Sequence, residues 1–110
     1  NLIIASDVWV SALIRRAELA GANAVVVRRG DARAGSVIVK VYDSSTRQAR
    51  LYSEAFGPDG DRLWMQPVTS EFESELDAYL DRQRRYDPDL WIVEIEDRQG
   101  RHFLTEKTQG

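Results

Sequence analysis

The chain has 110 residues, of which 43% are hydrophobic and 30% are charged, a length and balance typical of one globular domain. It contains no cysteine and a single histidine, which excludes disulfide scaffolds, thiol nucleophiles and zinc sites built on cysteine or on paired histidines. Its net charge is −3, whereas a general nucleic-acid binder carries a basic excess. The sequence therefore predicts one domain over residues 1–110, with no metal or other cofactor.

The location of the protein can be judged from its apolar stretches. None reaches the ~20 residues that a membrane-spanning helix needs. The opening residues NLIIASDVWV lack the positive start and uninterrupted apolar core of a secretory signal. We therefore expect a cytoplasmic protein that does not associate with a membrane.

The first predicted element is a helix from Asp7 to Ala20. Ser6 or Asp7 can cap its free amides, and Gly21 is typical of a helix end. Residues 2–4 add a short strand or prolong the apolar surface. Apolar residues recur along one stripe at helical spacing, at Trp9, Val10, Leu13, Ile14, Ala17 and Ala20.

The stretch VVVRRGDARAGSVIVKV, from Val25 to Val41, holds two β-branched runs around a polar turn. Residues 24–29 are continuously apolar up to two arginines, which predicts an inner strand covered on both faces. Residues 36–42 alternate as a second strand. A phosphate-binding loop would lead into a helix and carry GxxxxGK[ST], so a hairpin is favoured over an anion cradle.

Two further strands and a second helix follow. Residues 47–56 alternate, and residues 62–68 form a strand closed by Pro67. The segment SEFE at 70–73 has the pattern of a capping box, which predicts that a helix begins there. The helix ends at Asp87-Pro88, because a residue that precedes proline avoids helical geometry.

The last predicted strands are LWIVEIE, from Leu90, and residues 101–104, joined by a DRQG turn. Residues 105–110 are expected to be a frayed tail. The predicted order is helix, four strands, helix, two strands. Short polar turns favour antiparallel neighbours, so the fold class is α+β, with a mainly antiparallel sheet of five to six strands and two amphipathic helices packed on it.

Three arginines form the candidate ligand site. Arg28, Arg29 and Arg33 could clamp a carboxylate or phosphate of a small anion through their planar donor groups. The alternative is that Arg28 or Arg29 forms structural ion pairs. The acidic residues available for such pairs include Asp87, Asp89 and Asp97.

An interface candidate lies in the fourth strand. Trp64 shares a face with Arg62 and Gln66, opposite Leu63 and Met65. Exposed tryptophans often anchor protein interfaces, whereas buried ones belong to the core. Trp64, Arg62 and Gln66 are therefore predicted to form a contact surface.

No residue is predicted to be catalytic. The pairs Asp87 with Asp89 and Glu94 with Glu96 lack the controlled environment that paired acid–base carboxylates need. His102 has no nucleophile beside it in the sequence, and no serine lies in a GxSxG setting.

Three blocks carry a resemblance to a known family: DVWVSALIRRAELAGANAVVVRRGDARAGSVIVKV, RLWMQPV and RRYDPDLWIVEIEDRQGRHFL. Together they resemble a family of short alphaproteobacterial proteins known only as a domain of unknown function. The likeness covers nearly the whole chain. It implies a bacterial, stand-alone, cytoplasmic domain and no particular activity, cofactor or site residue.

Three functions follow from these observations. The leading hypothesis is a non-catalytic binding or adaptor domain, acting through a protein partner or as a homodimer joined at a sheet edge or at the Trp64 face. The first alternative is an enzyme or sensor that binds a small anionic ligand through Arg28, Arg29 and Arg33. The second is RNA binding, which the acidic start of the second helix disfavours.

Overall fold

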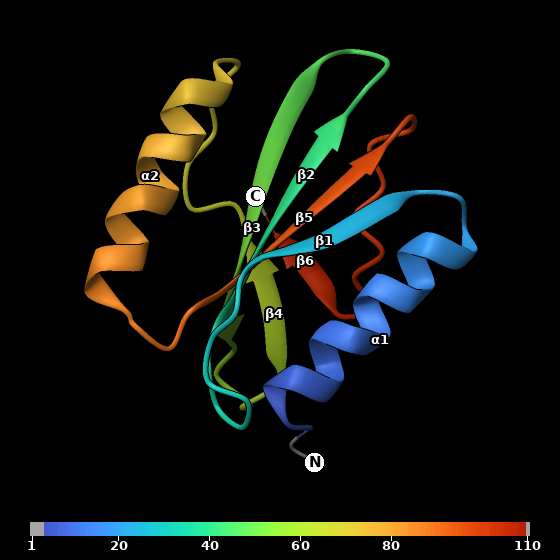
Figure 1. The fold of residues 1–110 in the computed structure, drawn as a ribbon. Coiled ribbons are helices and arrows are strands. Elements are labelled where there is room, and N and C mark those ends of the chain that lie inside the picture. The colour runs from blue at the N-terminus through green and yellow to red at the C-terminus, as the bar shows by residue number, and fades with distance from the viewer. Residues whose placement is uncertain (1–3, 110) are drawn as a thin grey trace.

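A computed structural model describes residues 4–109 and consists of one six-stranded sheet with a helix on each face (Figure 1). The α+β class and the predicted order of elements are confirmed. The elements are α1 (Ser6–Leu19), β1 (Asn23–Arg28), β2 (Val37–Asp43), β3 (Gln48–Phe56), β4 (Arg62–Met65), α2 (Glu73–Tyr86), β5 (Trp91–Asp97) and β6 (Lys107–Gln109).

The strands are arranged in the order β1-β5-β2-β3-β4-β6. β5 lies between β1 and β2, antiparallel to β1 and parallel to β2, and Val93 faces both Val26 and Val39. β4 and β6 are also parallel. The sheet is therefore mixed rather than mainly antiparallel, because one late strand enters between two early ones.

The segment between β1 and β2 is not the turn of a hairpin, so that prediction was wrong. The two strands do not pair with each other, and residues 29–36 cross over the beginning of β5 to connect them. Asp31 donates its backbone N–H to the carbonyl of Asp89, and Trp91 donates its own to the carbonyl of Ser36. The crossing segment is thus attached to the residues around the start of β5.

β1 lies at the edge of the sheet, which corrects the prediction of an inner strand. Its three consecutive valines are exposed, Val25 by 54%, Val26 by 39% and Val27 by 49%. Ala24 alone among the apolar residues of β1 is buried. An apolar run is typical of a strand covered on both faces, but here the run lies on an edge strand and stays exposed.

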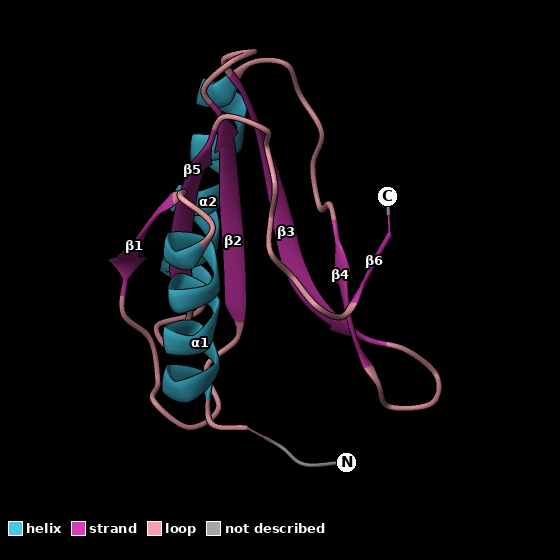
Figure 2. Ribbon diagram, turned by 90° about the vertical axis from the view of Figure 1, so that its right-hand side faces the viewer, coloured by secondary structure: helices cyan, strands magenta, loops and turns pink. Residues whose placement is uncertain are grey.

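The two helices cover opposite faces of the sheet, with α1 in front and α2 behind in Figure 2. The apolar side chains of β2 alternate between the two layers, since Val39 packs beneath α1 and Ile38 beneath α2. The core between α1 and the sheet contains Trp9, Leu13, Val37, Val41, Trp64, Trp91 and Ile95. The core between α2 and the sheet contains Leu51, Leu76, Leu80, Leu90 and Ile92.

The beginning of α2 differs from the predicted capping box. The helix begins at Glu73, and Phe72 is its N-cap without a side-chain hydrogen bond. Ser70 instead accepts a hydrogen bond from the backbone N–H of Phe72, so it orders the turn that leads to the helix. The helix ends at Tyr86, before Asp87-Pro88, as predicted.

The C-terminal part of the chain was also predicted incorrectly. Residues 101–104 form no strand, whereas Lys107–Gln109, expected to be frayed, forms β6 against β4. The segment after β5 passes along the side of the sheet that carries α1 before it reaches β4 (Figure 2). Residues 2 and 3 of the possible N-terminal strand lie outside the described range, and Ile4 is not in a strand.

Within residues 4–109, no helix is long and apolar enough to cross a membrane. The same range contains no group of three or more acidic or histidine side chains arranged to hold a metal ion.

Candidate functional site

Arg28 is bound to backbone carbonyls at the start of β5. Its Nη1 donates to the carbonyl oxygen of Leu90 at 2.7 Å and to that of Asp87 at 3.4 Å. The side chain is half-buried in this position. A ligand clamp that included Arg28 would have to give up these bonds, so the structure favours a structural role for this residue.

Arg29 and Arg33 lie apart from that contact. The guanidinium of Arg29 stacks over the indole of Trp91, 5.2 Å from the ring centroid, and Arg29 is exposed. Arg33 is also exposed, and its carbonyl accepts the backbone N–H of Ser6 at 3.2 Å. Each of the three arginines therefore makes a different contact, and binding of an anion by Arg29 and Arg33 stays a prediction.

The crossing segment presents carbonyl oxygens, rather than amides, to the start of α1. The backbone N–H of Asp7 donates to the carbonyl of Ala32 at 2.9 Å, and the hydroxyl of Ser6 donates to that of Gly35 at 2.7 Å. The N–H groups of Ser6 and Asp7 are therefore capped by this segment, whereas Asp7 Oδ1 accepts the N–H of Val8 at 2.8 Å. An anion cradle needs free amides, so the geometry is the reverse of a phosphate loop.

Trp64, the predicted interface residue, is fully buried, which corrects that prediction. Its indole stacks on that of Trp9, and its Nε1 donates to Glu106 Oε1 at 3.0 Å. Arg62 lies over the ring of Trp9 and pairs with Glu54 at 2.7 Å. Burial raises the pKa of Glu54, although the Arg62 charge opposes this. The Trp64 face is thus part of the core beneath α1.

Gln66, the third interface candidate, follows β4 and is half-buried. It lines two hollows of the surface, one on each side of Arg50. Of the predicted contact surface, Gln66 and the half-buried Arg62 therefore border open hollows, while Trp64 faces inward.

The exposed part of β1 is the largest uninterrupted apolar run on a sheet edge among residues 4–109. We name Val25, Val26 and Val27 the β1 edge surface. A register shift between Val26 and Arg28 ends the regular pairing with β5. The sequence could not show this surface, because an apolar run alone does not reveal which strand stands at the edge.

A polar hollow of about 570 Å³ lies between β3 and the segment that follows β5. Arg50 and Tyr52 line it from β3, and Arg101 and His102 line it from that segment. The His102 ring meets the ring of Tyr52 edge-on, with centroids 5.0 Å apart. We name this feature the Arg50–His102 hollow. Neither Arg50 nor His102 was predicted from the sequence to be a site residue.

Lys40 is buried beneath α2, in the middle of β2. Its Nζ lies 2.6 Å from Glu73 Oε2, 2.8 Å from Asp77 Oδ1 and 3.4 Å from Glu94 Oε1. Burial alone would lower the pKa of Lys40, but the bonds and charges of Asp77 and Glu73 outweigh it, so the pKa lies above 10.5. This cluster attaches α2 to the sheet.

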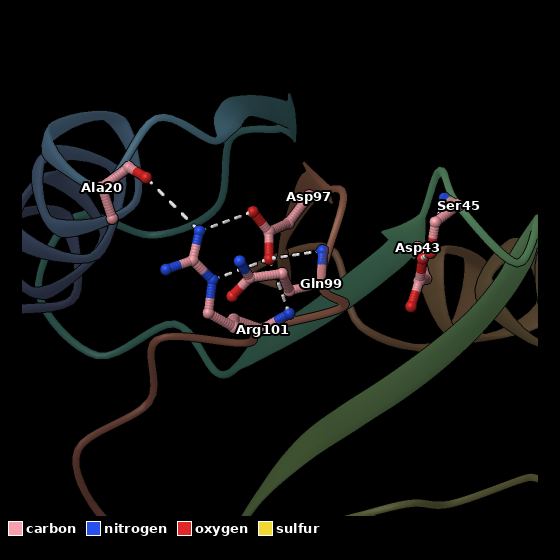
Figure 3. A network of polar contacts seen from close by, with 6 residues as sticks. All are labelled: Ala20, Asp43, Ser45, Asp97, Gln99 and Arg101. Atoms are coloured by element: carbon pink, nitrogen blue, oxygen red, sulfur yellow. Dashed lines mark hydrogen bonds and ion pairs between the residues drawn. The ribbon is translucent and has the colours of Figure 1, made fainter.

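Asp97 and Arg101 form a second polar cluster at the end of β5 (Figure 3). The buried Asp97 carboxylate accepts from Arg101 Nε and Nη2, each at 2.9 Å, and from the Gln99 and Arg101 amides. The Arg101 bonds lower the pKa of Asp97 to about 2. Arg101 also donates to the carbonyl of Ala20, so the cluster ties this turn to the end of α1.

The chain was compared with known families and structures. Residues 4–105 match the model described as a protein of unknown function (DUF1491). A crystal structure of a DUF1491 family protein from Caulobacter crescentus CB15 is 62% identical, with a TM-score of 0.94 over 96% of this chain and 99% of that one. An NMR structure of a DUF1491 family protein from the same organism is 60% identical, with a TM-score of 0.93 over 100% of both chains.

A more distant relative has the same fold. The solution structure of a protein from A. tumefaciens is 32% identical, with a TM-score of 0.82 over 99% of this chain and 98% of that chain. No curated protein matches the chain. The resemblance inferred from the three sequence blocks is confirmed, and the chain belongs to the DUF1491 family of proteins of unknown function.

Proposed function

We propose that this protein is a non-catalytic, self-associating binding domain, in which β1 of one copy pairs antiparallel with β1 of a second copy. The observation that carries the proposal is the β1 edge surface, where three consecutive valines lie exposed on a strand whose outer edge has no partner among residues 4–109. Such an edge is a template for another strand, and soluble proteins usually protect it with charges, proline or a covering segment. Residues 23–27 carry no charge and no proline.

The sequence of β1 is self-complementary about a two-fold axis at Val26. Antiparallel pairing centred there sets Val25 opposite Val27 of the second copy and Ala24 opposite Arg28 of the second copy. Four valines then adjoin on one face, and no arginine faces another arginine. Cross-strand pairs of β-branched residues stabilise antiparallel sheets.

The test is the oligomeric state of the protein and of two single variants, measured by analytical ultracentrifugation over a wide concentration range. Val25→Lys places a charge on the β1 edge surface and is expected to make the protein monomeric. The matched control is Val8→Lys, at a valine of α1 that is 57% exposed. This control is expected to remain dimeric, and circular dichroism checks that both variants are folded.

Two outcomes would overturn the proposal. One is an unmodified protein that stays monomeric at high micromolar concentration. In that case, a strand of a different protein would be the partner to test at the β1 edge. The other is a Val25→Lys variant that is folded and still dimeric. The cytoplasm stays the predicted compartment, and anion binding by Arg29 and Arg33 stays an alternative prediction.

A further inference from the structure

The Arg50–His102 hollow differs from the rest of this acidic protein in its charge. The chain as a whole has a net charge of −3, yet no aspartate or glutamate is found among the described residues that line the hollow. Two arginines, a histidine, a tyrosine, a threonine and three amide side chains line it instead. Hydrogen-bond donors thus gather around one concave surface.

Arg50 supplies the uncompensated charge of the hollow. It is exposed, and it forms no ion pair with any residue in the range 4–109. Arg101, by contrast, is held by Asp97 through Nε and Nη2. The position of Arg101 is therefore fixed before any ligand arrives. Within residues 4–109, its hydrogen bonds come from Nε and Nη2, which leaves Nη1 to face a ligand.

His102 is held as a neutral donor. Its Nδ1 accepts the backbone N–H of Leu104 at 2.9 Å, so the hydrogen of the neutral ring resides on Nε2. Burial lowers the pKa of His102, which keeps the ring neutral at pH 7. The edge-on contact with Tyr52 fixes the orientation of the ring.

From this arrangement we infer that the Arg50–His102 hollow binds the phosphate group of a small phosphorylated molecule. A phosphate oxyanion accepts charge-assisted hydrogen bonds from guanidinium groups and further bonds from neutral donors, which is the donor set present here. The hollow, at about 570 Å³, also leaves room for an organic group beside the phosphate. The inference is independent of the β1 edge surface, which lies at the opposite end of the strand order.

The experiment is an NMR titration of the ¹⁵N-labelled protein with three probes: inorganic phosphate, adenosine 5′-monophosphate and adenosine. The first two probes carry the oxyanion and the third lacks it. We expect saturable amide shifts with the monophosphate, centred on residues 99–103 and on Arg50, and none with adenosine. Saturable shifts at the same amides with inorganic phosphate alone would also support the inference and would show that the phosphate group suffices.

Two variants test which residues bind. Arg50→Gln removes the unpaired charge from an exposed position and is expected to weaken monophosphate binding about tenfold or more. The control, Arg15→Gln, removes an exposed arginine of α1 that does not line the hollow, and binding is expected to be unchanged.

Three results would overturn the inference. The first is the absence of saturable shifts with either phosphate probe up to about 10 mM, a concentration at which even millimolar affinity is visible. The second is equal binding of adenosine and the monophosphate. The third is a folded Arg50→Gln variant that binds the monophosphate as tightly as the unmodified protein does.

Discussion

The indole rings of Trp9 and Trp64 stack with their centroids 5.1 Å apart and their planes inclined by 26°. Trp9 is near the beginning of α1 and Trp64 is in β4, so the stack joins the first helix to the far side of the sheet. The bond from Trp64 to Glu106 adds the segment that leads into β6. One aromatic pair therefore connects three distant parts of the chain.

Replacing Trp64 by phenylalanine is expected to lower the free energy of unfolding by about 2–3 kcal/mol, because the variant loses buried ring area and the bond to Glu106. Urea unfolding followed by circular dichroism measures the change. Met65→Leu, at the neighbouring exposed position, is the control and should stay within about 0.5 kcal/mol of the unmodified protein. Equal losses in both variants would contradict the assignment.

Replacing Lys40 by methionine is expected to cost about 2 kcal/mol of stability at pH 7, since three carboxylates would lose their shared cation. The pKa of Lys40 is higher in the folded state than in the unfolded state. The contribution of Lys40 to the free energy of unfolding is therefore complete below pH 10.5 and is lost as the pH rises further. The stability difference between the two proteins should be constant from pH 7 to about 10 and should narrow above that. Lys107→Met, at the exposed second lysine, serves as the control.

Replacing Asp97 by asparagine is expected to lower stability at pH 7 by about 1–2 kcal/mol, because the charged bonds to Arg101 are lost at a partly exposed pair. The folded-state pKa of Asp97, about 2, lies below its ordinary value of 3.8. The contribution of Asp97 is thus present above pH 3.8 and disappears as the pH falls toward 2. Urea unfolding of the unmodified protein and of the Asp97→Asn variant, at pH 7 and pH 2.5, measures this contribution. A stability difference that is larger at pH 2.5 than at pH 7 would argue against the Asp97–Arg101 pair.

Replacing Gly30 by alanine is expected to destabilise the protein by more than about 2 kcal/mol. A Cβ at this position would clash with the carbonyl oxygen of Asp89 and would lie 2.6 Å from Trp91 Cδ1, so the backbone would have to move. The control is Ala34→Ser, at an exposed position of the same segment. Thermal unfolding distinguishes the two, and equal melting temperatures would show that the close contact is not retained in solution.

Most elements, though not β6, could be predicted from the sequence, but the pairing of the strands could not. α1 and β5 were located to within a residue or two, because apolar spacing and the Asp87-Pro88 stop are local signals. The insertion of β5 between β1 and β2 depends on pairing between residues about 70 positions apart, as for Val26 and Val93. No local pattern records such pairing, and the inner-strand and hairpin predictions failed for the same reason.

The surroundings of the predicted site residues also depend on contacts between distant parts of the chain. Alternation placed Trp64 on one face of its strand, but only the position of α1 decides that this face is buried. Arg28 ends an apolar run, yet its partners are carbonyls near residue 90. Arg50 and His102 are separated by half of the chain and line one hollow because the segment after β5 returns over β3.

The central position of β5 has a consequence for biosynthesis. β1 and β2 leave the ribosome first, and the strand that separates them is completed more than fifty residues later. At about 5–20 residues per second, β1 lacks its native partner, and β2 has β3 alone of its two neighbours, for several seconds. During that interval β1 can pair with the edge of β2 that β5 later occupies, in a hairpin that the finished protein does not contain. Translation speed through residues 44–97 therefore sets how long this competing arrangement has to form.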